Sequence, residues 1–224
     1  MFELPIFPLN TVLFPGMPLA LHIFEDRYKL MIGKCLHERR PFGVVLIRQG
    51  VEALGPLPEP NTVGCTAFIS QVERLQQGRM NIDVIGQRRF RIVSLEADLP
   101  YLHGQVEHYP LLEDDPPAQE TLANRLRPWV VRYLDHLSRL GEETLQAEHL
   151  PEEPAPLAYV AATLLQISAA QKQELLSIEK GTTLLAELRV IYRSELAILK
   201  AIGQLPGPEM GSDPNRDQGS FSLN

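Results

Sequence analysis

The chain has little of what secreted and membrane-spanning proteins need. It contains only two cysteines, Cys35 and Cys65, which are too few and too far apart for a disulfide framework. No stretch approaches the roughly eighteen uninterrupted apolar residues of a transmembrane helix. The first residues lack a basic segment followed by an apolar one, which is the pattern of a signal peptide. These absences predict a cytoplasmic protein with reduced thiols and no membrane partner.

The motifs of common enzymes are absent as well. A P-loop needs Gly-x4-Gly-Lys-Ser/Thr to hold phosphates, and the nearest pieces, Gly33-Lys34-Cys35 and Lys180-Gly181-Thr182, lack the glycine-rich loop. There is no Gly-x-Ser-x-Gly elbow and no His-Glu-x-x-His zinc helix. His103 and His108 lie five residues apart on a predicted strand, so they would point to opposite faces. We therefore expect no catalytic residue, no cofactor and no metal site.

The charge balance argues against nucleic acid as a partner. The formal net charge is -7, and an acidic surface repels phosphate backbones. The exception is a group of arginines near one predicted hairpin: Arg74, Arg79, Arg88, Arg89 and Arg91. Strand alternation places Arg89 and Arg91 on one face with Arg88 and Phe90 opposite, which divides the positive charge. Nucleic-acid binding is thus disfavoured, and an RNA-binding PUA-like protein is retained as the alternative function.

The first half of the chain has the pattern of short strands. Residues 3–7 and 18–23 are predicted strands, and the prolines and glycine between them, Pro8, Pro15 and Gly16, predict an irregular loop. Helical spacing begins at Glu25 and ends before Pro41. Further strands are predicted over 42–47, 62–75, 79–87, 90–95 and 101–109. Six or seven strands with one helix predict a barrel-like, mostly antiparallel domain over residues 1–112.

The second half has the pattern of helices. Pro116-Pro117 is typical of a helix start, Ser168 is a candidate N-cap for a helix over 169–178, and Thr182 precedes a long apolar periodic segment. These signals predict an α-helical bundle over residues 113–204. Residues 205–224 are rich in Pro, Gly, Ser and Asp and are predicted to be a disordered tail. The predicted fold class is therefore α+β, a PUA-like barrel followed by helices.

Several short motifs are more informative in their order than singly. They are Leu4-Pro5-Ile6-Phe7-Pro8-Leu9, Phe14-Pro15-Gly16, Glu25-Asp26-Arg27-Tyr28, Val63-Gly64-Cys65-Thr66-Ala67, Gly86-Gln87-Arg88-Arg89-Phe90-Arg91-Ile92 and Lys172-Gln173-Glu174-Leu175-Leu176. In this arrangement, over residues 1–202, the chain resembles the substrate-binding domain of ATP-dependent Lon proteases. It is similar to the free-standing form of that domain, without the ATPase and the serine–lysine peptidase. Thr183 stands where the family often has a basic residue.

The resemblance implies a non-enzymatic module that binds unfolded or damaged polypeptides, in protein quality control or as an adaptor. It also implies cooperation with a separate protease. The physical mechanism would be weak, multi-point contact between extended apolar segments and an exposed hydrophobic groove. We expect that groove around Phe14, Met17 and Tyr101. The sequence leaves the client, the binding surface and the oligomeric state open.

The remaining motif residues are expected to be structural. In the first turn of its helix, Glu25 would complement the helix dipole, and Arg27 would bridge a carboxylate or backbone carbonyls. Glycines in these motifs would serve turns, bulges or close backbone contacts, and the prolines would fix loops. The full set of structural motif residues is Pro8, Pro15, Gly16, Glu25, Arg27, Tyr28, Gly64, Gly86 and Arg89.

Overall fold

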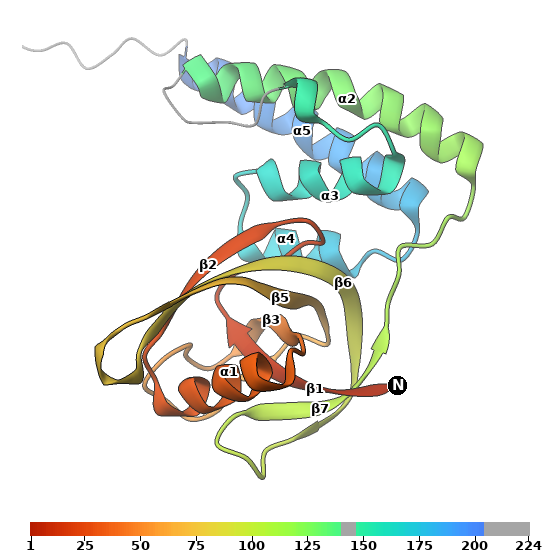
Figure 1. The fold of residues 1–224 in the computed structure, drawn as a ribbon. Helices are drawn as coiled ribbons and strands as arrows, with labels where there is room; N and C mark the ends of the chain where they lie inside the picture. The colour runs from red at the N-terminus through yellow and green to blue at the C-terminus, as the bar shows by residue number, and fades with distance from the viewer. Residues whose placement is uncertain (140–146, 204–224) are drawn as a thin grey trace, which may run out of the picture.

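The computed structural model describes residues 1–139 and 147–203 (Figure 1). The strands in these residues are β1 Phe2–Leu9, β2 Pro18–Ile23, β3 Phe42–Gln49, β4 Glu59–Pro60, β5 Val63–Arg74, β6 Met80–Glu96 and β7 Leu102–His108. The α-helices are α1 Asp26–Glu38, α2 Pro116–Arg139, α3 Pro154–Leu164, α4 Ala169–Ser177 and α5 Gly181–Gly203. None of these helices is long and apolar enough to cross a membrane. The predicted disordered tail lies outside the described residues.

The strands bond in a ring. Their order is β1–β7–β6–β5–β3, and β3 returns to pair with β1. The β1–β3 pair is parallel, whereas the other pairs in the sheet are antiparallel. The ring is filled by alternating apolar side chains, and α1 covers part of it with Met31 and Ile32 among its buried residues. The predicted fold class, a mostly antiparallel β unit followed by helices, is confirmed.

The sheet differs from the sequence prediction at two places, in β6 and at Pro8. The strands expected over 79–87 and 90–95 are one continuous strand, β6, because Gly86 allows the chain to pass close to another backbone without a break. A Cβ at Gly86 would lie 2.2 Å from the carbonyl oxygen of Phe14, and one at Gly64 would lie 2.4 Å from that of Val44. Both glycines therefore serve close backbone contacts, as expected.

Pro8 lies in a strand and not in a loop. It pairs with Val45 in the parallel β1–β3 ladder, whereas β1 pairs with β7 only as far as Ile6. Beyond Ile6 one edge of β1 has no strand partner in the described residues. Proline is tolerated at such an edge, since an amide donor is not needed there. Pro15, in contrast, lies in the expected loop, where the amide of Gly16 donates to the carbonyl of Gly86 at 2.8 Å.

Helices α2 to α5 stack on one side of the ring, apart from α1 (Figure 1). Ser168 caps α4, as predicted, by accepting from the amide of Gln171, and the structure adds a complete capping box. The core of these helices also includes side chains from the β-rich part, namely Val12, Phe14, Leu46, Val63 and Tyr109. The helical part and the ring thus bury apolar surface against each other. The division of the chain at residue 112 into two domains stays a prediction.

Asp114 joins the start of α2 to the start of α5. Its carboxylate accepts from the Thr182 amide at 3.2 Å and from the Thr182 hydroxyl at 2.5 Å. The buried side chain of Gln119 also donates to it at 3.0 Å. These donors, the Thr182 hydroxyl foremost, lower the pKa of Asp114 from its ordinary value of 3.8 to about 2.

A pH-dependent stability follows from this shift. Because the folded-state pKa is depressed, the contribution of Asp114 is present above the unfolded value of 3.8 and is lost as the pH falls through about 2. We expect Asp114→Asn to make the urea midpoint less dependent on pH between 4 and 2 than it is in the parent. Asp135→Asn, at an exposed position of α2, should leave the parent's pH dependence unchanged. Parallel pH profiles for Asp114→Asn and the parent would contradict this role.

Candidate functional site

The groove expected around Phe14, Met17 and Tyr101 does not exist. Phe14 is 0% exposed and packs in the core shared with the helices, while Tyr101 is 3% exposed and belongs to the core of the ring. Met17 is half-buried between these two cores. The loop that carries Phe14 is held against β6 by the Gly16 and Gly86 backbone bonds, which turn the aromatic side chain inward. The prediction was wrong because apolar loop residues can face the core as readily as the solvent.

A groove instead lies where β2, which is off the closed path of the ring, comes beside the end of β1. In the described residues, β2 pairs only with β6, and the last residues of β1 pair only with β3. A groove of about 310 Å³ lies at these unpaired edges. Its lining residues are Phe7, Leu9, Ala20, Leu21, His22, Ile23, Phe24, Glu25, Tyr28, Glu52 and Ala53. Every residue from Ala20 to Glu25 takes part, so the groove follows the β2 edge; we call it the β2 groove.

Aromatic side chains dominate the β2 groove. Phe24 is 42% exposed, and its ring stacks on that of His22 with centroids 5.9 Å apart. Phe7 and Tyr28 form a second pair with centroids 4.1 Å apart. Burial raises the pKa of Tyr28 to about 12, so its hydroxyl stays protonated. That hydroxyl is buried and has no hydrogen-bond partner in the part of the chain described. The groove therefore combines apolar rings with an unused donor.

A loop over residues 50–58 forms the far wall of the β2 groove. Glu25 pairs with Arg27 at 2.9 Å and accepts from the amide of Leu54 at 3.4 Å. Arg27 donates to the carbonyl of Gly55 at 3.2 Å. Glu52, in turn, accepts from the amide of Asn10 at 2.7 Å. These acids and the arginine hold the loop against α1 and β1, so the motif residues Glu25 and Arg27 shape the groove through structural contacts.

A second exposed apolar surface lies on the outside of the sheet. Phe68 of β5 and Ile85 of β6 are cross-strand partners and are 46% and 44% exposed. The neighbouring position on β2 is Pro18, which pairs with Ile85. This outer patch, defined by Phe68, Ile85 and Pro18, is flat sheet surface and is not part of the β2 groove.

The arginines do not form a joint basic surface. Arg89 and Arg91 both face the helical part, as the alternation predicted, and Arg89 is 2% exposed. Arg91 pairs with Glu179 at 2.9 Å, which raises its pKa, chiefly through that hydrogen bond. Arg88 is exposed. Arg89 is thus buried and Arg91 is paired with Glu179, so two of the five arginines are engaged within the protein, which weakens the case for RNA as a ligand.

The β2 groove was missed in the sequence for a definite reason. Its strand was predicted correctly over 18–23, and the alternating pattern showed one face toward the core. What makes a groove is the absence of a second partner for β2 and for the end of β1. That number of partners is a property of the ring's closure, and periodicity within one strand does not contain it. The available signal was Pro8, which is typical of an unpaired edge.

Comparison with known proteins gives a consistent result. The family model described as ATP-dependent protease La (LON) substrate-binding domain matches residues 3–191. A Lon protease of Syntrophus aciditrophicus is 27% identical over 226 residues, which are 98% of this chain and 28% of that protein. Another Lon protease, from Paraburkholderia phytofirmans, is 30% identical over 75% of this chain and 21% of its own length. The chain thus spans under a third of these relatives.

Solved structures similar to this chain are also Lon N-terminal domains. The Lon N-terminal domain protein of Xanthomonas campestris has a TM-score of 0.62 and 26% identity, with 84% of this chain and 97% of that chain covered. The N-terminal domain of the Mycobacterium avium complex Lon protease has a TM-score of 0.66 at 20% identity, over 87% and 99% of the two chains, and shows the same fold. With the ring, the helical part and the ordered motifs, these matches establish that the chain belongs to the family of Lon substrate-binding domains.

Proposed function

We propose that this chain binds unfolded or damaged polypeptides in the β2 groove and does not process them chemically. The family to which it belongs is described by substrate binding, and the chain spans 28% of the Lon protease of Syntrophus aciditrophicus. The observation that carries the proposal is the pair of unpaired strand edges beside an aromatic groove. A role in quality control or as an adaptor, with a separate protease and in the cytoplasm, is part of the same proposal.

The mechanism is strand addition. An extended segment lying along β2 would pair with the free backbone groups of that strand, because an unpaired edge presents amides and carbonyls in register. Successive side chains of the bound segment would then point in opposite directions, one set toward Phe24 and the other toward the solvent. Backbone pairing accepts many sequences, whereas a native protein has already paired its own strands. The groove therefore favours unfolded over folded clients without a sequence motif.

The β2 groove is small enough to make binding weak. Its volume of about 310 Å³ is at the lower end of ligand sites, which span roughly 300–1,000 Å³. A single short segment would gain little, so useful affinity requires several segments of one client or several copies of this chain. We expect short peptides to bind much more weakly than a long unfolded chain.

The function is tested with one client in two states. The full chain is titrated into a fluorescently labelled protein that is either native or permanently unfolded by reduction and alkylation. We expect the unfolded form to bind at least about tenfold more tightly, equivalent to about 1.4 kcal/mol, and to remain uncleaved by mass spectrometry. Equal affinity for both forms would overturn the proposed preference, and cleavage of the client would overturn the proposed lack of catalysis.

A further inference from the structure

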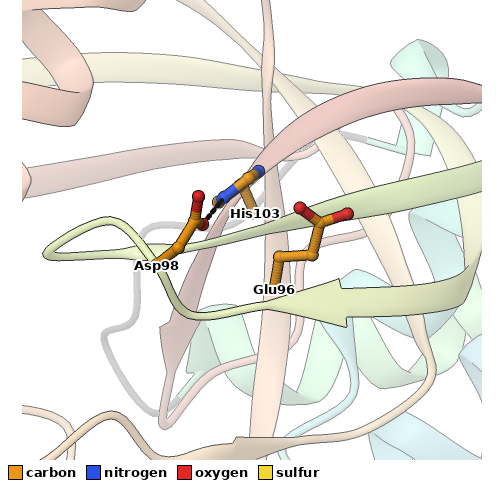
Figure 2. A group of neighbouring side chains, drawn as sticks. All are labelled: Glu96, Asp98 and His103. Atoms are coloured by element: carbon orange, nitrogen blue, oxygen red, sulfur yellow. Dashed lines mark hydrogen bonds and ion pairs between the residues drawn. The ribbon is translucent and has the colours of Figure 1, made fainter.

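The β6–β7 hairpin gathers three potential metal ligands that play no part in the β2 groove. Glu96, at the end of β6, is the cross-strand partner of His103 on β7, and Asp98 lies in the turn between them. One ligand atom from each side chain lies within 4.8 Å of the others (Figure 2). In the part of the chain described, no other three histidine, cysteine or acidic side chains come together in this way.

His103 is the buried member of this group. It is 8% exposed, whereas Glu96 and Asp98 are both exposed. Its Nε2 lies 2.5 Å from an Asp98 oxygen, and its Nδ1 lies 3.5 Å from an oxygen of Glu3 on β1. The ion pairs of Glu3 and Asp98 within the described residues are with His103 alone. Three carboxylates thus surround one imidazole.

A neutral imidazole does not satisfy both neighbours. It carries one N–H, so one ring nitrogen donates while the other presents a lone pair to a carboxylate. If Nε2 donates to Asp98, the lone pair of Nδ1 faces Glu3, and that buried Nδ1 has no hydrogen-bond partner. If Nδ1 donates to Glu3, the lone pair of Nε2 faces Asp98 at 2.5 Å. A metal ion on Nε2 would leave the single N–H on Nδ1, where it faces Glu3, and so would satisfy both ring nitrogens.

We propose that Glu96, Asp98 and His103 bind a divalent transition-metal ion of the Zn²⁺ class. Imidazole nitrogen and carboxylate oxygen are ligands of this class, at roughly 2.0–2.2 Å from Zn²⁺. Two such ligands lie about 3.4 Å apart around a tetrahedral ion, so Asp98 must move away from His103 by roughly 1 Å. Asp98 has a side chain that is 72% exposed and sits in a turn, which leaves it free to do so.

Glu3 would contact the ring nitrogen of His103 that does not bind the metal ion. With the metal ion on Nε2, the proton of His103 lies on Nδ1 and points toward the Glu3 carboxylate. This is the carboxylate–histidine–metal arrangement that orients a ligating imidazole and raises its basicity. The ion would join β6, the turn and β7 directly, and β1 through Glu3. Three protein ligands leave a coordination position for water or for a further ligand.

Sequence spacing alone offers no reason to group these residues. Glu96 and His103 become neighbours only through the hairpin register, in which they oppose each other. The pair considered from the sequence, His103 and His108, is indeed not brought together. His108 instead packs against the ring of Phe2 at 4.8 Å.

The test uses the full chain without a histidine tag, freed of metal by a chelator and titrated with Zn²⁺ in a calorimeter. We expect one equivalent to bind, and Glu96→Gln and Asp98→Asn each to raise Kd at least about tenfold, since each removes one ligand of three. Both positions are exposed, so the variants should fold. Glu107→Gln, on β7 and outside the cluster, removes the same charge from the same hairpin and should leave Kd unchanged.

A second readout is the absorption of Co²⁺, which reports nitrogen and oxygen ligation directly. We expect a visible band with the parent chain and with Glu107→Gln, and its loss with Asp98→Asn. Absence of Zn²⁺ binding to the parent would overturn the proposal. So would Zn²⁺ binding that Glu96→Gln and Asp98→Asn leave unaffected, because the ion would then lie elsewhere. Neither result bears on polypeptide binding, which does not involve this hairpin.

Discussion

Replacing Arg89 by methionine is expected to lower the free energy of unfolding by about 3 kcal/mol. Arg89 is buried, and its Nη1 donates to the carbonyls of Leu176 and Ile178, both at 2.6 Å. These carbonyls lie at the C-terminal end of α4, where the helix dipole favours a cation. Two charge-assisted bonds of this kind contribute roughly 3–6 kcal/mol. The methionine would leave both carbonyls without a donor.

Desolvation of the guanidinium acts in the opposite direction. Burial lowers the pKa of Arg89, while the hydroxyls of Tyr159 and Tyr109 oppose that effect, and no carboxylate is bonded to the guanidinium in the described residues. Stacking over the Tyr109 ring, with the guanidinium carbon 4.9 Å from the centroid, compensates part of the cost. The net expectation therefore lies at the lower end of the range given by the two bonds.

The matched control is Arg88→Met, one residue earlier on β6 and exposed. It should change the free energy of unfolding by no more than about 0.5 kcal/mol. Urea unfolding gives both values, and limited proteolysis between β7 and α2 reports whether the helices detach in the Arg89 variant. If the two variants lost equal stability, Arg89 would not be the contact that holds α4 against the ring.

The sequence predicted those features that depend on local chemistry. Ser168 was recognised as the N-cap of α4 because a serine just before a helical segment can accept from an amide of the first turn. Arg89 and Arg91 were placed on one face by alternation along a single strand. Helical spacing from Glu25 to before Pro41 likewise predicted a helix where α1 is found, over Asp26–Glu38. In each case the deciding interaction lies within a few residues along the chain.

The features that were mispredicted depend on distant segments. Two strands were expected over 79–87 and 90–95, yet β6 is continuous, and the loop carrying Phe14 lies against it at Gly86. Phe14 itself was expected at the surface, but helices more than a hundred residues later cover it. The free edge of β2 likewise reflects which strands close the ring. No local pattern carries this information, so the candidate site could be located only once the ring was known.

Replacing Phe24 by serine is expected to weaken binding of an unfolded client by about 30-fold, equivalent to about 2 kcal/mol. Phe24 is 42% exposed at the end of β2 and lines the β2 groove. A bound strand would cover roughly 80 Å² of its ring, and apolar area contributes about 25 cal/mol per Å² when removed from water. The position follows the last residue of the strand, so the fold should persist, which thermal unfolding checks.

Phe68→Ser provides a control, because it is the same substitution at a side chain of nearly equal exposure. Phe68 is 46% exposed in the outer patch, away from the β2 groove. If client binding depends on the unpaired edge, Phe68→Ser should change Kd less than about twofold while Phe24→Ser shows its full effect. Equal losses in both variants would indicate unspecific apolar attraction over the whole surface. A loss confined to Phe68→Ser would move the binding site to the outer patch, because only a ring that touches the client contributes its buried area to the affinity.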